Sequence, residues 1–161
     1  MAPVAMTASP TRRRRVFLYL TRGSTVLVLR HVDHPELRPE VPGGTIEPGE
    51  RPIDAALREA REETGLHALQ APELLGTRLL EPVPGAGVNG KLEAWYFRIA
   101  VGEGGPDVWR HVERHASGGA GDILFELWWA PPDALPPHHY ALAGIAPTDT
   151  RSYRRLRAGS T

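Results

Sequence analysis

The strongest structural constraint in the sequence is one amphipathic helical segment, residues 52–64, in a chain whose other apolar runs are short. Pro52 occupies the first turn, where a missing N–H costs nothing, and Gly65 follows the last residue, where a left-handed conformation ends a helix. Apolar side chains recur every three or four residues and form a stripe expected to face the core: Ile53, Ala56, Leu57, Ala60 and the methyl of Thr64. The pattern predicts a single helix packed on a sheet.

The apolar runs on either side of this helix predict strands. Residues 17–20 and 25–30 are separated by a short turn containing Gly23, which predicts a hairpin. Further strands are expected at residues 73–81, 92–101, 108–112 and 123–129. Strands that precede and follow one central helix favour an α/β or α+β layer fold.

The length of 161 residues predicts one domain. We expect residues 1–15 to be a disordered N-terminal tail, residues 16–140 to form the domain, and residues 141–161 to extend it or to be mobile, with a last helical turn at 151–157. The glycine-rich segments 84–90 and 117–121 are expected to be loops. The run of arginines at 12–15 could contact phosphates, but a solvated terminus is the favoured interpretation.

Composition excludes several classes of protein. The chain has no cysteine, so disulfides, thiolate zinc sites and cysteine nucleophiles are ruled out. Its formal net charge is zero, and stable binding to nucleic acid is therefore not expected. No apolar run approaches the roughly 18 residues of a membrane helix, and the N-terminus lacks the layout of a secretory signal. These features predict a cytoplasmic protein with no membrane partner.

Three carboxylates of the predicted helix form the first candidate site. At helical spacing Glu59, Glu62 and Glu63 fall within about 100° of one another, roughly opposite the apolar stripe. Like charges at this spacing destabilise a helix by a few tenths of a kcal/mol per pair unless a cation joins them. Hard oxygen ligands select ions such as Mg²⁺ or Mn²⁺. Taken alone, the triplet favours a solvated acidic helix face, because charged helix faces are common.

The residues around the triplet favour the metal site. Gly43 and Gly44 allow the backbone to come close to an ion or a phosphate, and a carbonyl there could complete a coordination shell. Arg58 lies beside the carboxylates and can pair with one of them, fixing its rotamer. Glu50 flanks the same group before the helix.

Nine of these positions form one spaced motif, G-x5-E-x7-R-E-U-x-E-E-x-G-U with U apolar, filled by Gly44, Glu50, Arg58, Glu59, Ala60, Glu62, Glu63, Gly65 and Leu66. This motif resembles the Nudix box in full. Ala60 is smaller than the residue usually found at its position. The resemblance implies the Nudix fold, an α/β/α sandwich in which a mixed sheet and a smaller sheet lie between helices. It also implies metal-dependent hydrolysis of a nucleoside diphosphate linked to another moiety, X.

The resemblance also implies roles for individual residues. Carried over by motif position, Glu59 and Glu63 are expected to be the principal metal ligands. Glu62 is expected to be a further ligand or the base that activates water. Arg58 and Glu50 are expected to position these groups, and Gly43 or Gly44 to supply the carbonyl ligand.

Residues outside the motif are less constrained by pattern. Family members often supply another acidic residue from a later loop, and Glu113 and Asp122 are the candidates, although a solvated acid is the commoner finding. Trp109 could stack on a base and Arg110 could meet a substrate phosphate. Trp109 could equally be a packing anchor. His31 and His34 are expected to be neutral surface residues.

Two rival functions stay open at this level. One is a nucleotide-sensing Nudix module without activity, against which the intact carboxylate set argues. The other is an isoprenoid-diphosphate isomerase of the same fold, which would need an additional nucleophile or acid. The sequence does not identify X, and a homodimer is expected only because homodimers are common in the family.

Overall fold

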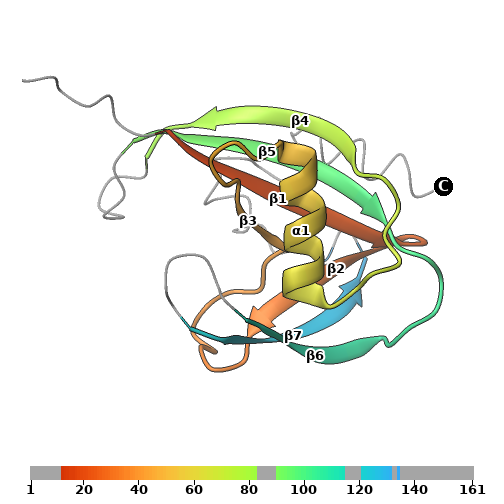
Figure 1. Ribbon diagram of the computed structural model, residues 1–161. Helices are drawn as coiled ribbons and strands as arrows, with labels where there is room; N and C mark the ends of the chain where they lie inside the picture. Colours follow the sequence, from red (N-terminus) through yellow and green to blue (C-terminus); the bar gives the residue numbers. More distant parts are fainter. Residues whose placement is uncertain (1–11, 83–89, 115–120, 132–133, 135–161) are drawn as a thin grey trace, which may run out of the picture.

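The computed structural model describes residues 12–82, 90–114, 121–131 and 134, in which one mixed sheet carries one helix on a face (Figure 1). The elements are β1 (Arg13–Arg22), β2 (Thr25–His31), β3 (Gly43–Thr45), α1 (Pro52–Thr64), β4 (Glu73–Leu80), β5 (Leu92–Ala100), β6 (Val108–Glu113) and β7 (Ile123–Ala130). The strand order is β4-β5-β1-β2-β7-β6, with β3 paired to β1. Since β1 and β5 are parallel and the other pairs antiparallel, the predicted mixed sheet is confirmed.

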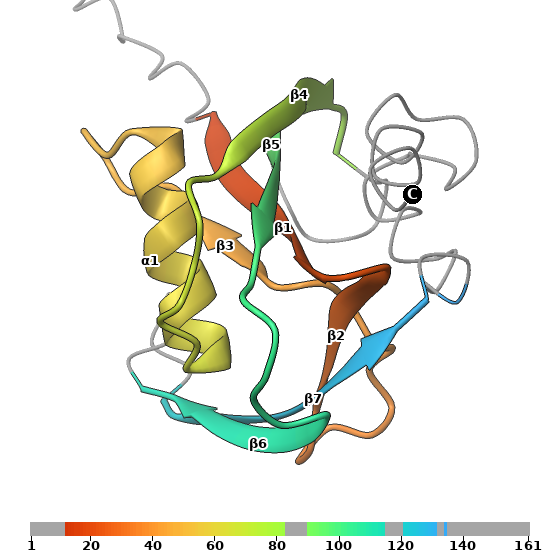
Figure 2. The same ribbon diagram turned by 90° about the vertical axis from the view of Figure 1, so that its right-hand side faces the viewer.

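The helix has the bounds that the sequence predicts. Pro52 stands at its first turn, and Gly65 ends it with φ 74° while its N–H donates to the Arg61 carbonyl at 2.9 Å. Figure 2 shows α1 against one face of the sheet, with its C-terminal end beside β6. The sequence therefore determines the helix locally, through its two ends.

The face that α1 buries agrees with the expected stripe only in part: Ala56, Ala60 and Thr64 are buried as predicted, whereas Ile53 and Leu57 are not. The buried apolar residues are small, namely Ala55, Ala56 and Ala60, whereas Ile53 is 37% exposed. Glu59 and Glu63 are buried beside these alanines, so the expectation that all three carboxylates lie opposite the core is wrong, and only Glu62 is exposed. The small side chains let α1 sit close to the sheet, which brings the adjacent carboxylates into the contact as well.

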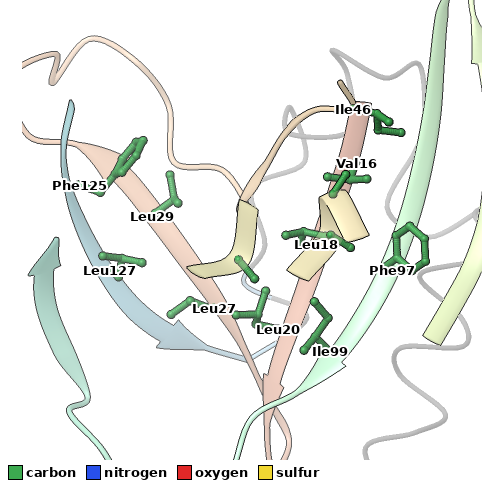
Figure 3. Packing of buried hydrophobic residues seen from close by; sticks show 13 residues of the cluster. Val16, Leu18, Leu20, Leu27, Leu29, Ile46, Phe97, Ile99, Phe125 and Leu127 are labelled. Carbon is green, nitrogen blue, oxygen red and sulfur yellow. The ribbon is translucent and has the colours of Figure 1, made fainter. Parts of the chain in front are cut away.

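The core between helix and sheet is built from alternate strand residues. Val16, Leu18 and Leu20 of β1 point toward α1 together with side chains of β2, β5 and β7, among them Leu27, Leu29, Phe97, Ile99, Phe125 and Leu127 (Figure 3). Tyr19 lies on the opposite face of β1 in a second buried cluster with Val26, Val28 and Tyr96. The period of two along β1 thus gives this strand two buried faces.

The first two strands diverge from each other. Only two residue pairs join them, Thr21↔Val26 and Arg22↔Thr25, next to the hairpin turn. Beyond these pairs β1 continues against β5 and β3, whereas β2 continues against β7 (Figure 1). The smaller sheet implied by the family resemblance corresponds to β2, β7 and β6, which form one sheet with the rest through this narrow junction.

Two strand predictions need correction. β1 begins at Arg13, before the expected boundary of the tail at residue 15, because residues 13–15 pair with Leu92–Ala94 of β5. β3 was not expected, since three residues rich in glycine carry no strand pattern. The rest of the expected tail, the predicted turn at 151–157 and most of both glycine-rich loops lie outside the described residues. Within the described residues, no helix has the length and apolar character needed to cross a membrane.

The packing of Gly65 against the His111 ring can be tested, and Gly49 serves as the control. Gly65 and Gly49 both have positive φ, 74° and 78°, but only a Cβ at Gly65 would press against the His111 ring. We expect Gly49→Ala to lower the free energy of unfolding by about 1 kcal/mol through backbone strain alone. Gly65→Ala should cost at least about 1 kcal/mol more, because the ring must also move. Urea denaturation measures both, and equal losses would contradict the packing role of Gly65.

Candidate active site

The close approach of β3 to α1 organises the candidate site. The Gly43 N–H donates to Glu63 Oε2 at 2.8 Å, which ties the strand to the helix. A Cβ at Gly44 would collide with the Glu59 carboxylate, and one at Gly43 would collide with the Val16 carbonyl. Gly44 is therefore required by the contact of β3 with α1, and Gly43 by the contact of β3 with β1, which gives a physical reason for the two successive glycines.

Three buried carboxylates meet beside this contact. Glu59, Glu63 and Glu113 each place one oxygen so that the three lie within 4.8 Å of one another. Their exposed fractions are only 2%, 9% and 6%. Glu59 and Glu63 lie one helical turn apart on α1, and Glu113 arrives from the end of β6. Buried like charges at this separation are unfavourable without protons or a cation, so this carboxylate triplet has the character of a cation site.

The electrostatics of the triplet follow from its burial. Burial raises the pKa of Glu59 to about 7, although Arg58 opposes the rise and Glu62 and Glu113 add to it. Burial also raises the pKa of Glu63 well above its usual range, opposed by the Gly43 N–H. The pKa of Glu113 rises for the same first reason, with Glu62 contributing. A bound divalent cation would favour the ionised forms of all three groups and would therefore oppose these rises in pKa.

Arg58 connects the acidic residues around the triplet through its hydrogen bonds. Its Nε and Nη2 donate to the two carboxylate oxygens of Glu50 at 2.8 and 2.9 Å, a paired contact that lowers the pKa of Glu50. Nη1 donates to Glu59 Oε1 at 2.9 Å and to Glu62 Oε2 at 3.1 Å. Nη2 also reaches the Thr45 carbonyl at 2.9 Å. Arg58 thus fixes the rotamers of several acids rather than one.

Strand β6 is clamped to the end of α1 by two side chains. Trp109 Nε1–H donates to the Thr64 carbonyl at 2.9 Å, and His111 Nε2 lies 2.9 Å from the Glu62 carbonyl, so that the Nε2–H tautomer donates there. The last carbonyls of a helix have no partner within the helix, and this clamp satisfies two of them. Glu113 is the next residue on the same face of β6, and the clamp therefore positions it beside Glu63.

The structure separates the other candidates. Trp109 packs at the helix end and against Trp129, as the packing interpretation predicts, while Arg110 lies on the other face of β6, 3.6 Å from Glu126. Asp122 is exposed and outside the triplet, so Glu113 is the later acid that joins the box residues. Substrate contacts by Trp109 and Arg110 stay predictions.

A cleft of about 280 Å³ opens over the triplet, where β1 and β2 diverge. Besides the triplet it is lined by Gly43 to Thr45 and by Arg15, His31, Glu40, Ile123 and Phe125. The sequence did not single out Glu40, and it favoured a solvated terminus for the arginine run that ends at Arg15 and a surface position for His31. The fold brings these three residues together from separate segments. His31 is half-buried edge-on to Phe125, with ring centroids 4.9 Å apart, and lies 3.4 Å from Glu40.

Comparison with known proteins agrees with this geometry. A family model described as "NUDIX domain" matches residues 11–154. An RNA pyrophosphohydrolase of Rhizobium meliloti (strain 1021) is 30% identical over 129 residues, 74% of this chain and 70% of that protein. Two solved structures share the fold: a MutT NUDIX hydrolase from Burkholderia pseudomallei (TM-score 0.58, 19% identity, 94% of this chain and 99% of that one) and a NUDIX hydrolase from Nitrosomonas europaea (0.57, 20%, 93% and 91%).

The chain belongs to the Nudix family. It is a Nudix hydrolase, and the fold implied by its motif is confirmed. Hydrolases of this family generally use a divalent metal, and the carboxylate triplet offers a set of ligands for one. Membership in a hydrolase family favours an enzyme over the sensing module and the isomerase.

The burial of the triplet predicts a coupling between pH, metal and stability. The raised pKa of Glu59 means that the folded chain holds this proton more tightly than the unfolded chain, whose pKa is near 4.5. Without metal, the stabilising effect of that proton is complete below pH 4.5 and is lost as the pH rises through about 7, by on the order of 3 kcal/mol. A divalent cation at one hundred times its Kd should restore about 2.7 kcal/mol.

Thermal melts from pH 5 to 8, with a chelator or with Mn²⁺, measure this coupling. The charge-neutralised double variant Glu59→Gln/Glu63→Gln should lose both the pH-dependent decline and most of the metal-induced gain. Glu73→Gln, at an exposed site on β4, is the matched control. A full metal-induced gain in the double variant would show that the cation binds elsewhere.

The contacts between β6 and the end of α1 predict that β6 affects metal binding at the triplet, because they position Glu113. Trp109→Phe keeps an aromatic ring but removes the donor to the Thr64 carbonyl. We expect a loss of about 1 kcal/mol in stability and severalfold weaker Mn²⁺ binding by calorimetry, because Glu113 is less firmly placed. Trp128→Phe controls for the change of ring. Unchanged Mn²⁺ affinity in Trp109→Phe would show that the clamp does not act on the triplet.

Proposed function

We propose that the protein is a metal-dependent pyrophosphohydrolase that cleaves the diphosphate linkage of a nucleoside diphosphate joined to another group, X. The observation that carries the proposal is the buried carboxylate triplet beside the residues of the Nudix box. The similarity to an RNA pyrophosphohydrolase supports a reaction at a phosphoric anhydride bond.

Glu59, Glu63 and Glu113 would hold the metal, and Mg²⁺ or Mn²⁺ fits their hard oxygen atoms. When bound, such an ion neutralises phosphate charge and lowers the pKa of water. Glu113 replaces Glu62 in the ligand set proposed here, since Glu62 lies outside the triplet. A carbonyl of Gly43 or Gly44, both of which line the cleft, is proposed as a further ligand.

Glu62 is left for proton transfer. Its side chain is exposed, and its Oε2 is held by Arg58 at 3.1 Å. Among the described residues, none forms a hydrogen bond with Glu62 Oε1. This oxygen can therefore accept the proton of the attacking water. Arg58 is itself anchored by Glu50, so this pair orients Glu62 rather than reacting.

The remaining expectations about partners accompany this proposal. A net charge of zero supports a small nucleotide derivative as the substrate rather than a long nucleic acid. A homodimer and a cytoplasmic location stay predictions.

A panel of nucleoside triphosphates, sugar nucleotides, dinucleoside polyphosphates, NADH and coenzyme A, each with Mg²⁺ or Mn²⁺, tests the function. Product identification then shows which bond breaks, and no cleavage of any compound would contradict the proposal.

Substitutions separate the proposed roles on whichever panel substrate is cleaved. We expect Glu63→Gln to lower kcat by about 10²–10⁴-fold through loss of a metal ligand, and Glu62→Gln by a similar factor through loss of the base. The two differ in metal binding, which only Glu63→Gln should weaken. Glu73→Gln serves again as the exposed control. Activities of both variants within about threefold of wild type would contradict the assignment.

A further inference from the structure

A second hollow continues from the cleft along the start of β1. It measures about 370 Å³ and is lined by residues 12–15 and by the segment from Thr45 to Pro48. Arg15 and Thr45, which pair across β1 and β3, line both this hollow and the cleft over the triplet. We call the hollow the arginine groove. Because the two hollows share these residues, they lie next to each other on the molecule.

The arginine groove carries cationic groups that are not all neutralised. Glu93 approaches Arg12 at 3.7 Å and Arg14 at 3.4 Å, and it also accepts the Trp95 Nε1–H at 2.8 Å. Among the described residues, no carboxylate forms an ion pair with Arg13 or Arg15. Arg15 instead lies over the Phe17 ring, 5.8 Å from its centroid.

The charge balance of the groove favours an anion. Glu47 is the one acid among its lining residues, and Glu93 is the acid beside it, against four arginines. A guanidinium is charged at all relevant pH values, and its planar fork matches the oxygens of a phosphate. Glu93 partly neutralises Arg12 and Arg14, so Arg13 and Arg15 are the arginines that remain to meet an anion.

The other end of the cleft has the opposite character. There a hollow of about 340 Å³ shares His31 and Ile123 with the cleft and contains Asp33, Glu36 and Asp122 together with Leu37 and Leu124. Its carboxylates repel phosphate, whereas its apolar side chains suit a neutral group. The cleft is thus flanked by a cationic hollow and an acidic one, which gives a bound ligand a preferred direction.

We propose that the arginine groove binds an oligophosphate chain, so that the preferred substrates carry at least one phosphate beyond the diphosphate that is cleaved. This inference rests on the proposed function and narrows its substrate class: X contains further phosphates rather than a neutral sugar. The extra phosphates lie along Arg13 and Arg15, and the uncharged end of the substrate lies toward His31. The arginine run is a part of the fold with a ligand, rather than a solvated terminus.

Two substrates that differ only in phosphate number test the inference. Diadenosine diphosphate and diadenosine pentaphosphate have identical ends, and wild-type kcat/KM should favour the pentaphosphate. Arg13 lines the groove but not the cleft over the triplet. Arg13→Gln should lower the pentaphosphate-to-diphosphate ratio about tenfold, the effect of one lost charge-assisted hydrogen bond. Arg78→Gln, at an exposed site on β4, should leave the ratio unchanged.

Binding without turnover separates failure of this inference from failure of the proposed function. Inorganic tripolyphosphate is titrated by calorimetry into wild type and Arg13→Gln in the presence of a chelator, with thermal melts to confirm folding. We expect tighter binding by wild type, about tenfold, and weakening of both proteins by salt. Equal binding by the two folded proteins overturns the arginine groove even if the hydrolase is active. Tighter wild-type binding supports the groove even if no panel compound is cleaved.

Discussion

The contact between β3 and α1 is the constraint on which the site depends. β3 can approach α1 this closely because Gly44 lacks a Cβ, which would collide with the Glu59 carboxylate, while the absence of a Cβ at Gly43 lets β3 pair closely with β1. The approach brings the Gly43 N–H to the Glu63 carboxylate and packs Glu59 under Gly44. Small alanines on the same helix face complete the fit. Burial of two carboxylates is therefore built into the packing of the fold.

Such burial opposes stability, and the surrounding contacts limit its effect. Arg58 compensates part of the negative charge and is held in place by Glu50. Trp109 and His111 satisfy helix carbonyls that would otherwise lack partners, and the same contacts bring Glu113 to the triplet. The chain keeps an unfavourable cluster of buried carboxylates at one place, where a bound cation would relieve it, and supports it with neutral hydrogen bonds on either side.

The sequence predicts the local parts of this structure well and the assembled parts poorly. The ends of α1 follow from Pro52 and Gly65, and the spacing of the box residues identifies Glu59 and Glu63. The predicted stripe of α1 is right at Ala56 and Ala60 and wrong at Ile53, because close packing against the sheet selects the small residues and buries the carboxylates beside them. Glu113 could be named only as a candidate, since nothing local shows that the end of β6 reaches α1. The start of β1 was placed too late because Arg13 carries no strand pattern and is fixed by pairing with β5.

The narrow junction between β1 and β2 has a consequence for the width of the cleft. Two residue pairs hold the halves of the sheet together, and each half keeps its own ladder of hydrogen bonds. Glu59 and Glu63 act with one half through β3, while Glu113 belongs to the other. α1 also joins the two halves, because it is bound to β3 through Glu63 and to β6 through Trp109 and His111. The helix therefore bridges the narrow junction, and the width of the cleft depends on its contacts with both halves.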